Sequence, residues 1–79
     1  MERLNTPNKV AGIKQTKAAI KSQNALVVFV ASDAAPSAVG EVIDLCKEMN
    51  VELVCDHTRK EIAKACRIDV PCAAAAVLK

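Results

Sequence analysis

The sequence predicts an α/β fold, a three-layer α/β/α sandwich in which a small mixed four-stranded sheet carries helices on both faces. Short β-branched apolar runs alternate along the chain with longer amphipathic patterns, which is typical of strands alternating with helices. The size agrees, because 79 residues, 52% of them apolar, supply one shared core and no more. We therefore expect a single domain over residues 1–79.

The first half of the chain predicts two strands around one helix. Residues 8–11 predict a short strand, and residues 12–23 predict a helix that Gly12 opens. One face of this helix is apolar at i, i+3 and i+7 spacing, and consists of Ile13, Thr16 and Ile20. Residues 25–31 are apolar and rich in β-branched side chains, which is typical of a strand covered on both faces.

A second helix and strand come next. Asp33 as N-cap and Pro36 in the first turn predict the helix start, and Asn50 predicts its C-cap. The apolar stripe of this helix consists of Val39, Val42, Ile43, Cys46 and Met49. Apolar side chains at alternate positions of residues 51–55 predict the next strand.

The last part of the chain predicts a helix, a loop and a strand. Thr58 and Glu61 have capping-box spacing and predict the helix start. The apolar face of this helix consists of Ile62, Ala65 and Cys66. Residues 68–71 predict a loop, and Cys72–Leu78 predicts the final strand.

Composition excludes several function classes. Phe29 is the only aromatic residue, so modules that stack bases on exposed rings are nearly excluded. Two glycines are too few for a dinucleotide-binding fingerprint or a P-loop. The sequence has no apolar signal core and no stretch long enough to cross a bilayer. We expect a cytoplasmic protein with free thiols and no membrane partner.

Catalysis and metal binding have weak support. Cys55 and His57 could be a nucleophile and its base, since they would share a face of a strand, but no oxyanion motif or carboxylate pair accompanies them. The sequence therefore favours a packed thiol beside a surface histidine, and a protein that is not an enzyme. The four cysteines lack the close pairing of zinc ligands. We expect no metal and no cofactor, with Cys46, Cys55 and Cys66 in the core.

Charge is distributed unevenly along the chain. Residues 1–23 carry five cations against one acid, residues 24–57 carry one cation against six acids, and residues 58–67 carry four cations against one acid. If the fold brings the two basic blocks together, they form an anion-attracting patch that the net charge of +2 conceals. A solvated surface of mixed sign is the alternative.

Two local features point to a binding surface. Lys14, Lys17 and Lys21 share a sector of the first predicted helix, and Lys14 and Gln15 lie in its first turn, where free N–H groups attract phosphate. Lysine can also bond to guanine edges, and glutamine to adenine edges. Residues 68–76 are unusually apolar for a loop and its exit, and an exposed apolar loop favours a docking partner. A solvated helix and a tucked loop are the alternatives.

Three segments, Gly12–Thr16, Ala25–Pro36 and Ile68–Ala73, follow one another at a recognisable spacing. Together they resemble the kink-turn RNA-binding ribosomal proteins of the large-subunit seven-Ae/thirty-e superfamily, whose short bacterial members are about this length. Each motif alone is modest, but three in the right order form a strong signal. The resemblance covers nearly the whole chain, from about residue 9 to residue 78.

The resemblance implies an α/β/α fold and binding to a kink-turn, an RNA helix bent by a bulge next to sheared G·A pairs. The glycine-led helix start would enter the widened major groove at the G·A pairs, and the apolar loop would contact the splayed bulge nucleotides. The resemblance and the lysine stripe together give the expected RNA-binding residues, which are Gly12, Ile13, Lys14, Gln15, Thr16, Lys17, Lys21, Ile68, Asp69, Val70, Pro71, Cys72 and Ala73. We expect a ribosomal or ribosome-associated protein that binds kink-turn RNA and is monomeric when free.

Three departures from the family pattern concern RNA affinity or target choice more than the fold. Ala18 stands where the family usually has lysine, Ala35 where a polar residue often precedes the proline, and Arg67 where glycine often ends the last helix. Within that helix, Ile62-Ala63 replaces the usual Leu-Gly. A protein–protein interaction module on the same fold, with weakened RNA binding, is therefore the alternative function.

Overall fold

The computed structural model describes residue 4 and residues 6–79. Strands and helices alternate in the order β1 (Lys9–Ala11), α1 (Ile13–Lys21), β2 (Ala25–Ala31), α2 (Pro36–Met49), β3 (Glu52–His57), α3 (Arg59–Ala65) and β4 (Ala74–Leu78). The four strands form one sheet in the order β1-β4-β2-β3, in which β4 runs antiparallel to both neighbours and β2 runs parallel to β3.

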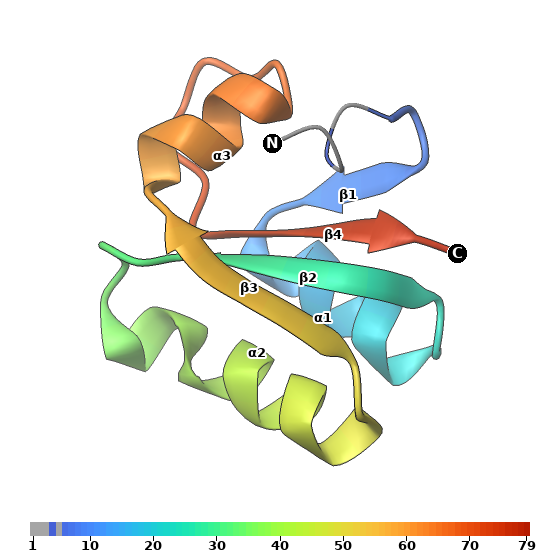
Figure 1. Cartoon of the computed structure of the whole chain (residues 1–79). Coiled ribbons are helices and arrows are strands. Elements are labelled where there is room, and N and C mark those ends of the chain that lie inside the picture. Colours follow the sequence, from blue (N-terminus) through green and yellow to red (C-terminus); the bar gives the residue numbers. More distant parts are fainter. Residues whose placement is uncertain (1–3, 5) are drawn as a thin grey trace.

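Helices cover both faces of this sheet, with α1 and α2 on one face and α3 on the other (Figure 1). The buried cluster on the α1 and α2 face includes Ile20, Val28, Val30, Val42, Cys46, Ala74 and Ala76. The buried cluster on the α3 face includes Leu4, Val27, Phe29, Ile62, Cys66, Ala75 and Val77. The predicted α/β/α sandwich with a mixed sheet is thus confirmed. Among the described residues, no helix has the length and apolar character of a membrane span.

Strand β4 is central and is built largely of alanine. Ala74, Ala75 and Ala76 have no exposed surface, and they lie between β1 and β2. Their small side chains leave space for helical side chains to approach the sheet from both faces. The strand begins two residues later than predicted, because the N–H of Cys72 donates to the carbonyl of Arg59 instead of joining the ladder.

The start of α2 differs from its prediction, whereas its end does not. Its N-cap is Ala35, which makes no side-chain cap, so the predicted role of Asp33 there is wrong. Asp33 instead accepts a hydrogen bond from the N–H of Arg59, at the start of α3. Asn50 ends α2 in the left-handed conformation, with φ 61°, as a C-cap residue should.

Candidate nucleic-acid interface

The two segments expected to bind RNA lie at the same end of the sheet. The N–H of Gly12, just before α1, donates to the carbonyl of Ala74 at the first residue of β4, over 2.8 Å. The apolar loop enters β4 at that same residue, and the N–H of Cys72 ties the loop to α3 over 3.3 Å. Residues 62 positions apart in the chain are therefore hydrogen-bonded here, and the helix start lies beside the point where the loop enters the sheet.

The first turn of α1 is open. Gly12 has φ 103° and ψ 150°, a conformation that essentially only glycine adopts, and no side chain caps the helix. The first turn has no acidic residue, and the side chains of Lys14 and Gln15 are exposed. Backbone N–H groups at a helix start, with the positive end of the helix dipole, bind anions. This turn therefore offers phosphate two kinds of donor, from the backbone and from a lysine.

Thr16 lies outside this surface, contrary to its inclusion among the RNA-contacting residues. It is fully buried, and its hydroxyl oxygen has no hydrogen-bond partner in the described part of the chain. A side chain without exposed surface cannot touch RNA in this conformation. Ile13 is half-buried and packs against the α1 and α2 cluster, so it also serves mainly to anchor the helix.

The lysine stripe of α1 divides into two parts. Lys17 Nζ donates to Glu41 Oε2 of α2 over 2.9 Å, whereas Lys14 at the helix start forms no ion pair with a described residue. The hydrogen bond and the charge of Lys17 lower the pKa of the Glu41 carboxyl, desolvation opposes them, and the charge of Lys21 adds a smaller lowering effect. Glu41 of α2 therefore offsets part of the positive potential at Lys17 and Lys21, whereas no described acidic side chain pairs with Lys14.

The apolar loop is projected outward by the end of α3. Arg67 has φ 59°, and the N–H of Ile68 donates to the carbonyl of Ala63, which together form a Schellman-type helix end. After this turn, Ile68 is 37% exposed and Val70 is 64% exposed. The alternative of a tucked loop is thus wrong for these residues, although Cys72 beyond them is buried.

The loop and α3 enclose a shallow hollow of about 330 Å³. Its lining consists of Lys60, Ala63, Lys64, Ile68, Asp69, Val70 and Pro71. Apolar side chains next to two ammonium groups suit a nucleotide, whose base is largely apolar on its faces and whose phosphate is anionic. Lys60 and Lys64 are additional to the expected contacts, and their spacing of four residues on the helix just before the loop is the signal that could have identified them.

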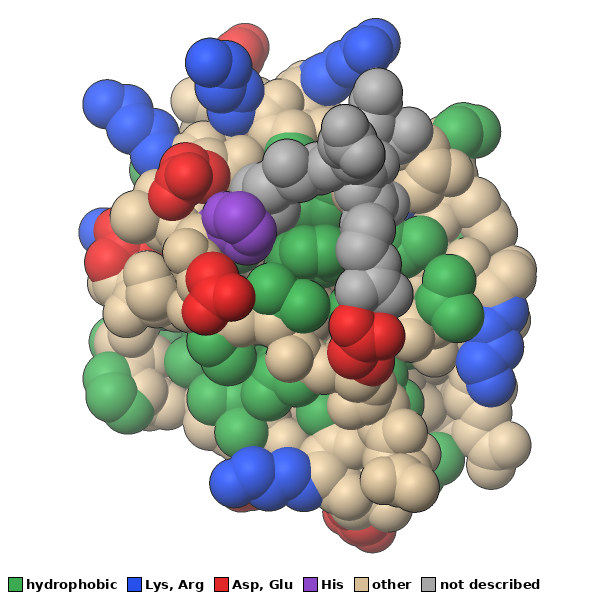
Figure 2. Space-filling view, in the orientation of Figure 1, with side chains coloured by type: hydrophobic (Ala, Val, Ile, Leu, Met, Phe, Trp, Pro, Cys, Tyr) green, Lys and Arg blue, Asp and Glu red, His purple; other side chains and the backbone are tan. Residues whose placement is uncertain are grey.

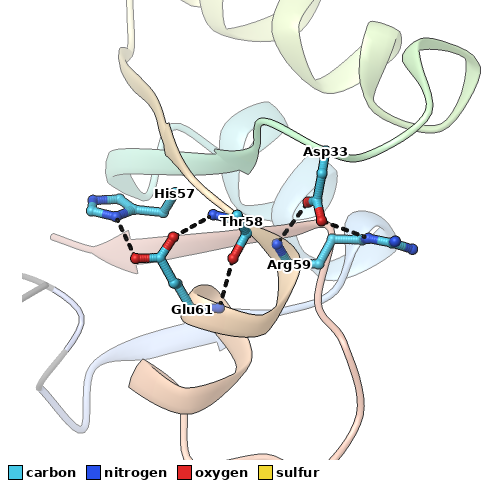
Figure 3. Close-up of polar contacts among 5 residues, drawn as sticks. All are labelled: Asp33, His57, Thr58, Arg59 and Glu61. Atoms are coloured by element: carbon cyan, nitrogen blue, oxygen red, sulfur yellow. Dashed lines mark hydrogen bonds and ion pairs between the residues drawn. The ribbon is translucent and has the colours of Figure 1, made fainter.

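The start of α3 is capped by three side chains, which fix the geometry around the loop (Figure 3). Thr58 and Glu61 form the predicted capping box, with hydrogen bonds of 3.2 and 3.0 Å. Asp33 Oδ1 accepts from the N–H of Arg59 over 2.8 Å, and the Arg59 guanidinium lies 3.6 Å from Asp33 Oδ2. The backbone N–H of Arg59 is the main cause that lowers the pKa of Asp33. Asp33 thereby ties the segment between β2 and α2 to α3.

The two basic blocks border this end of the sheet from opposite layers. Figure 2 shows Lys and Arg side chains along the upper rim of the molecule, in the region where Figure 1 draws α3. Helix α1 lies on the other face of the sheet, so its lysines do not merge with the cations of α3, whereas Lys9 of the first block and Arg67 of the second line one hollow. Arg3 of the first block lies outside the described residues.

Cys55 and His57 do not share a face, contrary to expectation. The pairing of β2 with β3 shifts register between Phe29 and Ala31, and the His57 ring lies 6.2 Å from the Phe29 ring, on the α3 side. Burial, and then the proximity of Cys55, raises the pKa of the Cys46 thiol on α2 to about 11, which places Cys55 near α2. The sheet thus separates the thiol from the imidazole.

Cys55 is exposed, so its predicted place in the core is wrong, whereas Cys46, Cys66 and Cys72 are buried. Cys55 lies in an edge strand, where its outer side is open to solvent. In residue 4 and residues 6–79, no group of three or more His, Cys, Asp or Glu side chains could hold a metal ion.

Residues 2–79 match the ribosomal protein L7Ae/L30e/S12e/Gadd45 family. An RNA-binding protein of Geobacillus sp. (strain WCH70) is 41% identical over 76 residues, which cover 96% of this chain and 93% of that protein. The large ribosomal subunit protein eL8 of Halobacterium salinarum is 38% identical over 68 residues, which cover 85% of this chain and 57% of that protein. The solved structure of a Giardia lamblia 15.5kD RNA binding protein superposes with a TM-score of 0.88 over 99% of this chain and 66% of that chain; at 22% identity this likeness concerns the fold alone.

Proposed function

This chain belongs to the ribosomal protein L7Ae/L30e/S12e/Gadd45 family, and from that premise we propose that it binds RNA and recognises a kink-turn. In this proposal the start of α1 and the apolar loop bind the RNA on the two sides of its bend, where a bulge adjoins sheared G·A pairs. The protein acts by binding alone, as a ribosomal or ribosome-associated component in the cytoplasm, and is monomeric when free.

One observation carries the proposal. The hydrogen bond from Gly12 to Ala74 places an uncapped, basic helix start next to an exposed apolar loop. The helix start suits an anionic backbone, and the loop suits an unstacked base. A sharply bent RNA presents both features within a short distance, whereas a regular helix keeps its bases stacked and its major groove too narrow for side chains.

The two parts of the site have different tasks in this proposal. Lys14 and Gln15 reach the edges of the G·A pairs, where lysine can bond to guanine and glutamine to adenine. Val70, with Ile68 and Pro71, contacts the splayed nucleotides of the bulge. Because these contacts exist only in the bent RNA, binding shifts the RNA from its extended form toward the kinked form.

Two RNAs of equal length and charge test this proposal. The first contains a bulge followed by sheared G·A pairs, and in the second those pairs are replaced by Watson–Crick pairs. We expect titrations at moderate salt to give at least tenfold tighter binding of the first RNA, since nonspecific electrostatic attraction is the same for both. Equal affinity for the two RNAs would contradict specific recognition.

A pair of variants isolates the loop. Val70→Ser should reduce the preference for the kinked RNA, because Val70 is 64% exposed in the loop. Leu26→Ser is the matched control, because Leu26 is 53% exposed but lies near the start of β2, at the opposite end of the sheet. If both variants bind the kinked RNA as the unmodified protein does, the loop is free for another partner, as in the protein–protein alternative.

A further inference from the structure

A second hollow, of about 300 Å³, lies beside the proposed site. It is lined by Thr6, Pro7, Lys9 and Arg67, so β1 and its preceding segment form one side and the end of α3 the other. Two of these four residues are cations, and none is acidic. The chemistry of this lining favours an anion with oxygen ligands.

Lys9 is held in place at this hollow. Its ammonium group donates to the carbonyl of Thr6 over 2.7 Å, which restrains a side chain that is usually mobile. Its charge also reaches the end of α3, where it opposes the raising of the pKa of the Cys66 thiol by burial. The cation therefore lies close to α3 and does not extend into bulk solvent.

Arg67 lines the same hollow and has a left-handed backbone conformation, which is strained for a residue other than glycine. With φ 59° it occupies the position of a helix end where glycine fits without strain, and its side chain is exposed. The ion pairs among the described residues join Lys17 to Glu41, Arg59 to Asp33 and His57 to Glu61, and leave Lys9 and Arg67 without a described acidic partner. An arginine in a glycine position that forms no such pair points to a ligand.

The hollow adjoins both parts of the proposed site. Lys9 precedes Gly12 by three residues of extended chain, a distance of about 10 Å. Arg67 directly precedes Ile68, where the apolar loop begins. RNA that contacts the helix start and the loop would therefore continue past these two cations.

We propose that Lys9 and Arg67 form a phosphate-binding subsite for the RNA stem that continues from the bend. The inference rests on the proposed function and adds to it a contact with the RNA backbone, outside the bend itself. Such a contact carries no sequence information, but it fixes the orientation of the stem on the protein.

The test compares kinked RNAs with a long and with a truncated flanking stem, each titrated at several salt concentrations. The variants are Lys9→Ala, Arg67→Gly and the double variant, with Lys47→Ala on α2 as the matched control for a lost exposed charge. Each substitution in the hollow should weaken binding of the long-stem RNA roughly threefold to tenfold and lower the salt slope by about one. The truncated RNA should bind all proteins with nearly the same affinity.

Arg67→Gly separates a binding role from a structural one. Because glycine suits the left-handed conformation, its melting temperature should equal or exceed that of the unmodified protein while RNA affinity falls. Titration with inorganic phosphate, followed by the amide resonances of Arg67 and Lys9, tests the other source of this ligand.

The outcomes are distinct. If the unmodified protein prefers the kinked RNA but the hollow variants match Lys47→Ala, the subsite is absent and the proposed function stands. If inorganic phosphate binds the hollow while stem length has no effect on RNA affinity, the subsite does not serve RNA. If the unmodified protein does not distinguish kinked from control RNA, both proposals fail.

Discussion

The first turns of α1 and α3 differ in whether side chains accept hydrogen bonds from their backbone N–H groups. At α3, Thr58 and Asp33 accept from backbone N–H groups, and Glu61 completes the capping box. At α1, no side chain caps the helix, and Lys14 and Gln15 stand where an acid would be stabilising. A capping residue stabilises a helix by about 1 kcal/mol, so the start of α3 gains a contribution to folding stability that the uncapped start of α1 lacks.

A third helix shows that a bare start is not sufficient for a site. Helix α2 also lacks a side-chain cap and acids in its first turn, but Pro36 occupies that turn and no lysine or arginine accompanies it. What distinguishes α1 is the combination of open N–H groups, a basic side chain and the neighbouring apolar loop. The difference among the helices agrees with the proposed function, in which the start of α1 binds RNA and the capped start of α3 stabilises the fold.

Gln15→Glu makes α1 more like α3 and should have the largest effect on binding. The acid favours the helix dipole, so the free energy of unfolding should rise by about 0.3–1 kcal/mol. Affinity for kinked RNA should nevertheless fall at least tenfold in low salt, because the base-edge contact is lost and the added negative charge is repelled by the nearby phosphates. Thermal denaturation and titration of the same preparation measure the two opposite changes.

Gln15→Ala is the control for this substitution. It removes the base-edge contact without adding charge, and should cost roughly 1–3 kcal/mol of discrimination with little salt dependence. The excess loss in Gln15→Glu should shrink as salt rises. Identical affinities of the two variants in low salt would contradict a phosphate at the start of α1.

Asp33→Ala tests the capped start of α3. Removing the acceptor for the Arg59 N–H should lower the melting temperature at pH 7 by several degrees, and Asp33→Asn, which keeps an acceptor, should have a smaller effect. The folded pKa of Asp33 lies below its ordinary value of 3.8, so its charged form stabilises the fold above that pH. This contribution is lost as pH falls through the folded pKa.

The stability difference between Asp33→Asn and the unmodified protein should therefore shrink as the pH falls toward the folded pKa of Asp33. Melting temperatures measured between pH 7 and pH 3 follow this convergence. A difference that persists unchanged at the acidic end would mean that the charge of Asp33 does not hold the β2–α2 connection to α3.

Glu41→Gln should have the smallest effect and the opposite sign. It releases Lys17 and Lys21 from the carboxylate of α2, so RNA affinity should rise about twofold to threefold in low salt, as is usual for an exposed pair. Glu48→Gln, a change of the same charge farther along α2, controls for net charge. Equal gains in both variants would place Lys17 outside the interface.

Much of the fold could be predicted because its signals are local. The capping box at Thr58 and the left-handed Asn50 depend on residues a few positions apart, and both are confirmed. The sequence alone predicts the wrong helix for the cap formed by Asp33, because its partner, Arg59, lies 26 residues away and only the tertiary fold brings the two together.

The candidate site was predictable in outline and less so in detail. Helical spacing alone does not reveal that Thr16 is buried or that Lys17 meets Glu41, because both facts depend on how α1 packs against its neighbours. Cys55 and His57 lie on different faces because the pairing of β2 with β3 shifts register. The alternation of side chains along a regular strand does not reveal such a shift. The RNA contacts themselves stay a prediction.

The central position of β4 has a consequence for synthesis on the ribosome. This strand is synthesised after the other three, yet both β1 and β2 pair with it. In the pairing with β1, Lys9 lies opposite Val77, which is 68 residues later in the chain. Vectorial synthesis therefore leaves β1 without its neighbour until the final stretch of sheet emerges. The helix start and the loop meet at Ala74, so an incomplete nascent chain would lack the proposed RNA-binding surface.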